Sequence, residues 1–97
     1  MDFTSLTNDI LKIDQLLTSK AKTSINICVT IRNWLFGYYI QEYEVGGSDR
    51  AKYGEKLLSN LARELQNNKI TSSSYANLKL YRQFYQSYKG IGQTLSS

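Results

Sequence analysis

Four polar side chains near the end of the chain have the types and the spacing of a DNA-reading surface. They are Lys79, Arg82, Gln83 and Gln86, which a helix over residues 74–89 would place on its outer face. Arginine hydrogen-bonds to guanine edges in the major groove and glutamine to adenine edges, so this set has the chemistry of a recognition helix. The same residues would also suit the solvated face of a plain antiparallel helix pair, and both interpretations stay open.

The basic residues lie mostly in the second half of the chain. Of the 97 residues, 12 are lysine or arginine and 8 are aspartate or glutamate, for a net charge of +4. Residues 1–45 sum to −1 and residues 46–97 to +5, an asymmetry typical of a surface that meets a polyanion. We therefore predict a DNA-binding surface made by Arg50, Lys52, Lys56, Lys79, Arg82, Gln83, Gln86 and Lys89.

Aromatic side chains are interleaved with these polar ones, as in the run Tyr81–Tyr85. Rings beside basic groups can stack on unpaired bases. Aromatic residues at helical spacing more often belong to a core or an interface, and that is the role we expect here.

The composition gives little support to catalysis or to metal binding. The chain has no histidine, which removes the commonest general base and the commonest transition-metal ligand. Its single cysteine, Cys28, cannot form an internal disulfide, and its apolar neighbours favour a buried thiol. Glu42 and Glu44 lie two apart, on different faces of a helix, and make no catalytic pair. We expect no cofactor, no metal and no small-molecule substrate.

The sequence also lacks the features of a secreted or membrane protein. No uncharged run approaches the about 20 residues that span a bilayer. The chain begins Met1-Asp2, without the basic region that precedes the apolar part of a signal peptide. We expect a cytoplasmic protein with no membrane partner.

The elements that must position these residues are helices. Glycine and serine clusters divide the proline-free chain into helices over about residues 4–19, 20 or 23–45, 49–66 and 74–89. The fold class is all-α: a small bundle forming one domain over residues 1–97, with a helix-turn-helix-like C-terminal pair. The residues expected to be buried are Trp34, Leu35, Tyr39, Leu57, Leu61 and Leu78.

The second of these helices is apolar around almost its whole circumference, which predicts burial on most sides. Its β-branched residues between Ile25 and Ile31 would also suit a strand, but its length favours a helix about 35–39 Å long. Such a helix is longer than the domain is wide, so either Gly37 marks a bend or one end projects into a partner subunit. We predict a homodimer whose interface contains Leu6, Ile10, Trp34 and Tyr38.

Local signals add five expectations. Ser74 should cap the fourth helix, and Ser48 or Asp49 the third. Gly54 lies inside the third helix, where close packing against the second would explain it. Arg32 needs a partner, for which Glu42 or Glu44 of a neighbouring subunit are candidates. Arg82 has an alternative role: it would be a buried ion-pair partner of Glu55 or Glu64, and it would then not read bases.

Five segments together resemble a known family: Arg32–Ile40, Asp49–Leu58, Asn77-Leu78, Arg82–Tyr85 and Gln93–Ser96. They are similar to the N-terminal domain of YhcG-type proteins, domain of unknown function family 1016, over roughly residues 20–96. The resemblance implies a helical region that precedes a PD-(D/E)XK nuclease domain in a larger protein.

The nuclease chemistry of that family has no counterpart in this chain. A PD-(D/E)XK site needs an aspartate and a separate Glu/Asp-X-Lys to hold a divalent metal. Here Glu55 is followed directly by Lys56, and no strand pattern is present to carry such a motif. We expect a non-catalytic module that targets a nuclease to DNA. The alternative is a homodimerisation or protein-docking module that does not bind nucleic acid.

Overall fold

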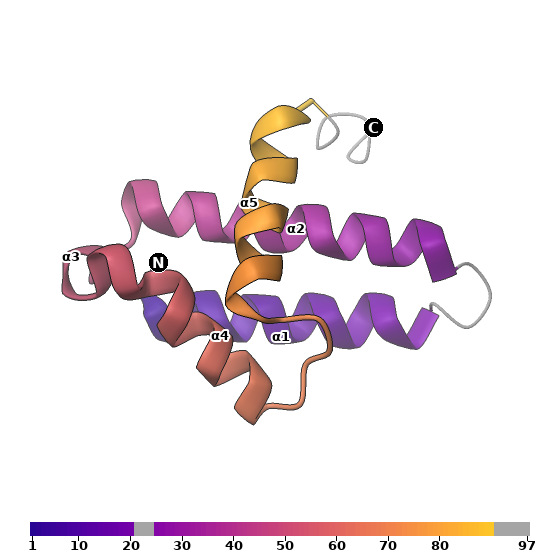
Figure 1. Cartoon of the computed structure of the whole chain (residues 1–97), viewed down its shortest axis with the longest axis horizontal. Coiled ribbons are helices and arrows are strands. Elements are labelled where there is room, and N and C mark those ends of the chain that lie inside the picture. Colours follow the sequence, from indigo (N-terminus) through magenta and orange to yellow (C-terminus); the bar gives the residue numbers. More distant parts are fainter. Residues whose placement is uncertain (21–24, 91–97) are drawn as a thin grey trace.

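The computed structural model describes residues 1–20 and 25–90 as an assembly of helices (Figure 1). The four long helices are α1 (Phe3–Lys20), α2 (Ile25–Gly46), α4 (Leu57–Asn67) and α5 (Tyr75–Ser87). The short helix α3 (Arg50–Tyr53) and the 3₁₀ turn η1 (Gly54–Lys56) connect α2 to α4. These two ranges contain no strand, and Ile25–Ile31 is helical. The predicted all-α fold with a long second helix is confirmed.

Helix α2 lies at the centre of the fold. α1 runs antiparallel beside it, and α5 crosses its middle (Figure 1). With 22 residues, α2 is about 33 Å long at a rise of ~1.5 Å per residue. The longest extent of the molecule is 39 Å, so α2 fits along the long axis and neither end has to project into a partner.

The core forms where α1, α2, α4 and α5 meet. Its fully buried side chains are Leu6, Ile10, Phe36, Ile40, Tyr43, Leu61, Leu65 and Leu78. Among the residues predicted to be buried, Trp34, Leu57, Leu61 and Leu78 are buried, but Leu35 and Tyr39 are only half-buried. These two lie one turn apart on α2, so the side of the helix that they share is only partly covered.

Gly37 allows α5 to cross α2 closely. A Cβ atom at position 37 would lie 2.1 Å from the carbonyl oxygen of Tyr81 and 2.9 Å from the Cβ of Tyr85. α2 continues through Gly37 without interruption. The expected bend is therefore not the reason for this glycine. Its missing side chain leaves room for the backbone of α5.

Gly54 ends α3 rather than packing inside a continuous helix. Its φ angle is +49°, in the left-handed region that glycine enters without the steric cost of a Cβ atom. No atom lies within 4 Å of the position that its Cβ would take. The predicted helix over residues 49–66 is thus broken, and the close-packing explanation for Gly54 is wrong. The broken segment turns the chain from α3 through η1 into α4.

Arg32 is paired within its own chain. Its side chain is 4% exposed, and Nη1 lies 2.9 Å from Oδ1 of Asp14 on α1. Nε and Nη2 donate hydrogen bonds to Oδ1 of Asn33, and the guanidinium lies 4.9 Å from the Phe36 ring centroid. The expected partners, Glu42 and Glu44 of a neighbour, are wrong. The antiparallel pairing of α1 and α2 brings an acid 18 residues away in sequence to this position instead.

Asp49 caps α1 rather than α3. The backbone N–H of Phe3 donates to Oδ1 of Asp49 at 3.0 Å, and the Tyr43 hydroxyl donates to the same oxygen at 2.6 Å. Asp49 makes no side-chain cap bond to α3. The N–H of Ser48 also donates to the carbonyl oxygen of Met1. The loop after α2 therefore fastens the first turn of α1, where a carboxylate is favoured by the helix dipole.

The buried phenol of Tyr43 predicts a loss of stability in alkaline solution. Burial, and then the hydrogen bond to Asp49, raise the pKa of Tyr43 well above its ordinary value. The folded state therefore favours the neutral phenol, and this stabilisation is present below pH ~10 and is lost as pH rises toward the folded-state pKa. We expect the melting temperature, followed by circular dichroism, to fall between about pH 9 and about pH 11.

Tyr43→Phe is the matched variant for this prediction. It should be less stable at pH 7 by about 2 kcal/mol, because the hydrogen bond to a charged group is lost. It should also show a shallower fall above pH 9, to which Tyr39 and Tyr85 still contribute because burial raises the pKa of each. An equally steep fall in both proteins would assign the alkaline effect to other groups.

Candidate nucleic-acid interface

Helix α5 is held by a cap at its start, by a bond to the loop before it, and by a contact with α2 just after its end. At its start, the Ser74 hydroxyl accepts a hydrogen bond from the N–H of Asn77 at 3.2 Å, which confirms the predicted cap. At its end, Nε1 of Trp34 donates to the carbonyl oxygen of Tyr88 at 2.9 Å. Between them, the buried Tyr81 donates its hydroxyl to the carbonyl oxygen of Ser72. The outer side of α5 is thus held in a defined orientation.

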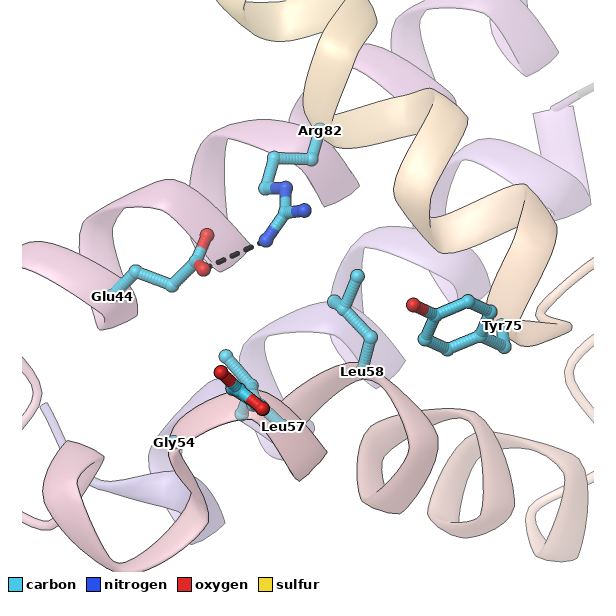
Figure 2. A pocket seen from close by; sticks show the side chains of 7 residues that line it. Glu44, Gly54, Leu57, Leu58, Tyr75 and Arg82 are labelled. Carbon is cyan, nitrogen blue, oxygen red and sulfur yellow. Dashed lines mark hydrogen bonds and ion pairs between the residues drawn. The ribbon is translucent and has the colours of Figure 1, made fainter.

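Arg82 is not the exposed base reader that the spacing predicts. Its Nη1 lies 2.7 Å from Oε2 of Glu44 on α2, and the two side chains are 26% and 33% exposed (Figure 2). The expected partners, Glu55 and Glu64, are wrong. Position 82 follows Leu78 by one turn, on the flank of α5 that faces the end of α2. This ion pair neutralises Arg82 and braces α5 against α2.

The other predicted DNA-binding residues are at the surface. Gln86 donates from Nε2 to Oε1 of Gln41 at 2.7 Å, so its amide is already engaged. Arg50 donates from Nη1 to the carbonyl oxygen of Gly47. The remaining five are exposed: Lys52, Lys56, Lys79, Gln83 and Lys89. The predicted set therefore falls in two places, the α3–η1 segment and the outer side of α5 with the residue after it.

A hollow of about 340 Å³ opens between the η1 turn and the side of α5 that carries Tyr75 and Arg82. Its lining residues come from the end of α2, the turn into α4 and the near side of α5: Glu44, Gly54, Glu55, Leu57, Leu58, Tyr75 and Arg82 (Figure 2). A second hollow of about 220 Å³ shares Glu44, Gly54 and Leu57 with it and adds Tyr43 and Arg50. The two adjoin, and we call them together the α4–α5 groove.

Sequence reasoning missed most of this groove. Tyr75 and Arg82 are seven residues apart, so helical spacing alone places them on one side of α5. That signal could have been used. Glu44 and Glu55 could not have been found in this way, because the crossing of α5 over α2 and the break at Gly54 bring them to the site.

The residues predicted for a dimer interface lie elsewhere. Leu6 and Ile10 are fully buried and Trp34 is 4% exposed, all within the single chain. Tyr38 is half-buried, with ring contacts to Trp34, Tyr39 and Tyr85. The apolar stripe expected to face a partner is thus largely covered by other helices of the same chain. Homodimerisation itself stays a prediction.

Two further observations concern other kinds of site. Within residues 1–20 and 25–90, no three cysteine, aspartate or glutamate side chains gather closely enough to hold a metal ion. Across the same part of the chain, no helix combines the length and the apolar character that a membrane span requires.

Comparison with known protein families identifies the family of this chain. The model of the family described as the DUF1016 N-terminal domain matches residues 9–97. Neither a curated protein nor a solved structure matches the chain. The match covers far more than half of the sequence, including all four long helices from the middle of α1 onward. The chain belongs to the DUF1016 N-terminal domain family.

Proposed function

We propose that this domain binds DNA without catalysing a reaction on it, and that it brings a nuclease domain of the PD-(D/E)XK type to its substrate. The nuclease part of the proposal comes from what the family resemblance implies. The DNA part is carried by one observation: five predicted cations stay exposed after Arg82 is neutralised. They are Arg50, Lys52, Lys56, Lys79 and Lys89.

Three of these cations, Arg50, Lys56 and Lys79, lie on or beside the α4–α5 groove. Arg50 lines it, and Lys56 lies between Glu55 and Leu57, which both line it. Lys79 follows Tyr75, another lining residue, by one helical turn. Gln83 is exposed and is not bonded within the described residues, so it replaces Arg82 as the candidate base reader. Lysine and arginine around a concave surface suit a phosphate backbone, whose neutralisation releases counterions.

The test is a salt titration of DNA binding. About four phosphate contacts should give a log–log salt slope near −3.6, from roughly −0.9 per phosphate. Lys79→Ala should weaken binding to all sequences about equally and make the slope shallower by about 0.9. Fluorescence anisotropy with labelled duplex and single-stranded DNA at about 50 mM and about 200 mM salt measures both quantities.

Lys12→Ala is the matched control, because Lys12 is an exposed lysine on α1 in the acidic half of the chain. It should leave the affinity and the slope unchanged. If neither duplex nor single-stranded DNA binds at low salt to a folded protein, the DNA-binding proposal is abandoned.

A second candidate function is assembly, and the outer side of α5 favours it. Leu80 and Tyr88 are each 58% exposed, and the half-buried Phe84 lies between them at a spacing of four residues. Such an apolar stripe is unusual on a helix that faces only water, and it suits a second copy of the domain. Light scattering should then show a dimer that Leu80→Lys converts to a monomer. A wild-type monomer at high micromolar concentration would exclude this candidate.

A further inference from the structure

We infer that the α4–α5 groove takes one unpaired nucleobase that carries an exocyclic amino group, and so gives the domain a preference for single-stranded DNA. This inference rests on the proposed DNA binding and deepens it. The hollow under Tyr75, at about 340 Å³, lies at the small end of the ~300–1,000 Å³ range of ligand pockets. That size suits one flat heterocycle and not a base pair within a stack.

The apolar part of the hollow suits the faces of a base. Leu57 and Leu58 form its floor and are 4% and 5% exposed. Tyr75 stands at its edge with 48% of its surface exposed, and Figure 2 shows its hydroxyl end directed toward Leu58. An exposed aromatic ring beside an apolar floor is a stacking platform that any base can use.

The polar part of the hollow suits the edge of a base and not a phosphate. Two carboxylates, Glu44 and Glu55, line it against one guanidinium, Arg82, so the lining has a charge of −1. Arg82 engages one oxygen of Glu44. Within the described part of the chain, Glu55 has no hydrogen-bond partner through its carboxylate. A net negative charge repels a phosphate, whereas carboxylate oxygens accept hydrogen bonds from N–H groups.

Carboxylates near a base discriminate by its exocyclic group. Cytosine, adenine and guanine carry an amino group that can donate to Glu55, as cytosine N4 donates to carboxylates in base readout. Thymine presents a carbonyl oxygen at the equivalent position, which a carboxylate repels. The cations Arg50, Lys56 and Lys79 lie outside this hollow's lining but close to it in the chain, where they can hold the phosphates on either side of the base.

The experiment compares two homopolymers that differ in this group. Labelled oligo(dC) and oligo(dT), each about 12 nucleotides long, are titrated with the protein by anisotropy at about 50 mM salt, beside a duplex of equal length. We expect oligo(dC) to bind at least about fivefold more tightly than oligo(dT), and more tightly than the duplex. Glu55→Ala should bring the ratio of the two homopolymer affinities close to about 1.

Tyr75→Ala tests the stacking platform. It should weaken oligo(dC) binding by about 5- to 100-fold, the range found for loss of one base–aromatic stack. Leu16→Ala is the control: it truncates a comparably exposed large side chain, 51% exposed, on α1 and outside the lining of both hollows. It should leave the affinity unchanged. Melting curves of both variants confirm that they fold.

The outcomes separate the inference from the function on which it rests. Equal binding of oligo(dC) and oligo(dT), tighter binding of the duplex, or equal effects of Tyr75→Ala and Leu16→Ala would overturn the base pocket and leave salt-dependent DNA binding intact. Failure of the wild-type protein to bind any of the three DNAs would overturn both.

Discussion

Gly37→Ala is expected to destabilise the domain by about 3 kcal/mol or more, at or beyond the upper end of overpacking costs. The added methyl group would lie 2.1 Å from a backbone oxygen of α5, and no rotation of a side chain can relieve that contact. α5 would have to move away from α2. For a domain of this size, each kcal/mol lowers the melting temperature by about 4–8 °C, so we expect a fall of about 12 °C or more.

Gly46→Ala is the control for this prediction. It makes the same substitution in the same helix, at a position where no atom lies within 4 Å of the new Cβ. Alanine is the better helix former, so this variant should be as stable as the wild type or slightly more stable. Equal melting temperatures for the two variants would contradict the close crossing of α5 over α2.

Asp14→Ala is expected to cost about 3–5 kcal/mol, because it removes the carboxylate beside a buried guanidinium. The side chains of Arg32 and Asp14 are 4% and 16% exposed, so water screens their interaction little. The charge of Arg32 would then remain beside the Phe36 ring, with Oδ1 of Asn33 accepting hydrogen bonds from Nε and Nη2. Urea unfolding measured by circular dichroism gives the free energy.

Two variants show whether the cost comes from the stranded charge. Adding Arg32→Met to Asp14→Ala should recover most of the lost stability, since a buried ion pair replaced by apolar groups is often neutral. Glu44→Ala, which breaks the more exposed pair with Arg82, should cost only ~1 kcal/mol or less. If Asp14→Ala also costs this little, the Arg32 pair contributes no more than a surface ion pair.

Much of the fold can be predicted from the sequence, because the positions of the helices depend on residues that are close together in the chain. Apolar spacing predicts the four long helices, and Ser74 caps α5 as a side-chain acceptor at this position should. Gly37 and Gly54 show where such reasoning ends. One glycine leaves space for a helix 44 residues later in the chain, and the other takes a left-handed conformation; their roles were assigned wrongly because both depend on tertiary structure.

The candidate site is predictable only in part for the same reason. A lysine on the polar face of a helix needs no partner within the chain. The sequence pattern alone therefore predicts that Lys79 is exposed. The partner of Arg82 is 38 residues away, and nothing in the local pattern distinguishes Glu44 from Glu55 or Glu64. The predicted interface residues, Leu6 and Ile10, fail similarly: an amphipathic stripe shows that a helix must be covered, but not by which chain.

The crossing of α5 over the centre of α2 also constrains how the protein is made. A chain that has emerged from the ribosome only as far as α4 lacks Tyr81 and Tyr85, the α5 rings that contact Phe36 and Trp34. The parts of Trp34 and Phe36 that those rings contact stay open to water, and to chaperones, until residues 75–87 have emerged. Nascent chains stalled before Tyr75 should therefore be sensitive to protease throughout, and protection should arise in one step once α5 is complete.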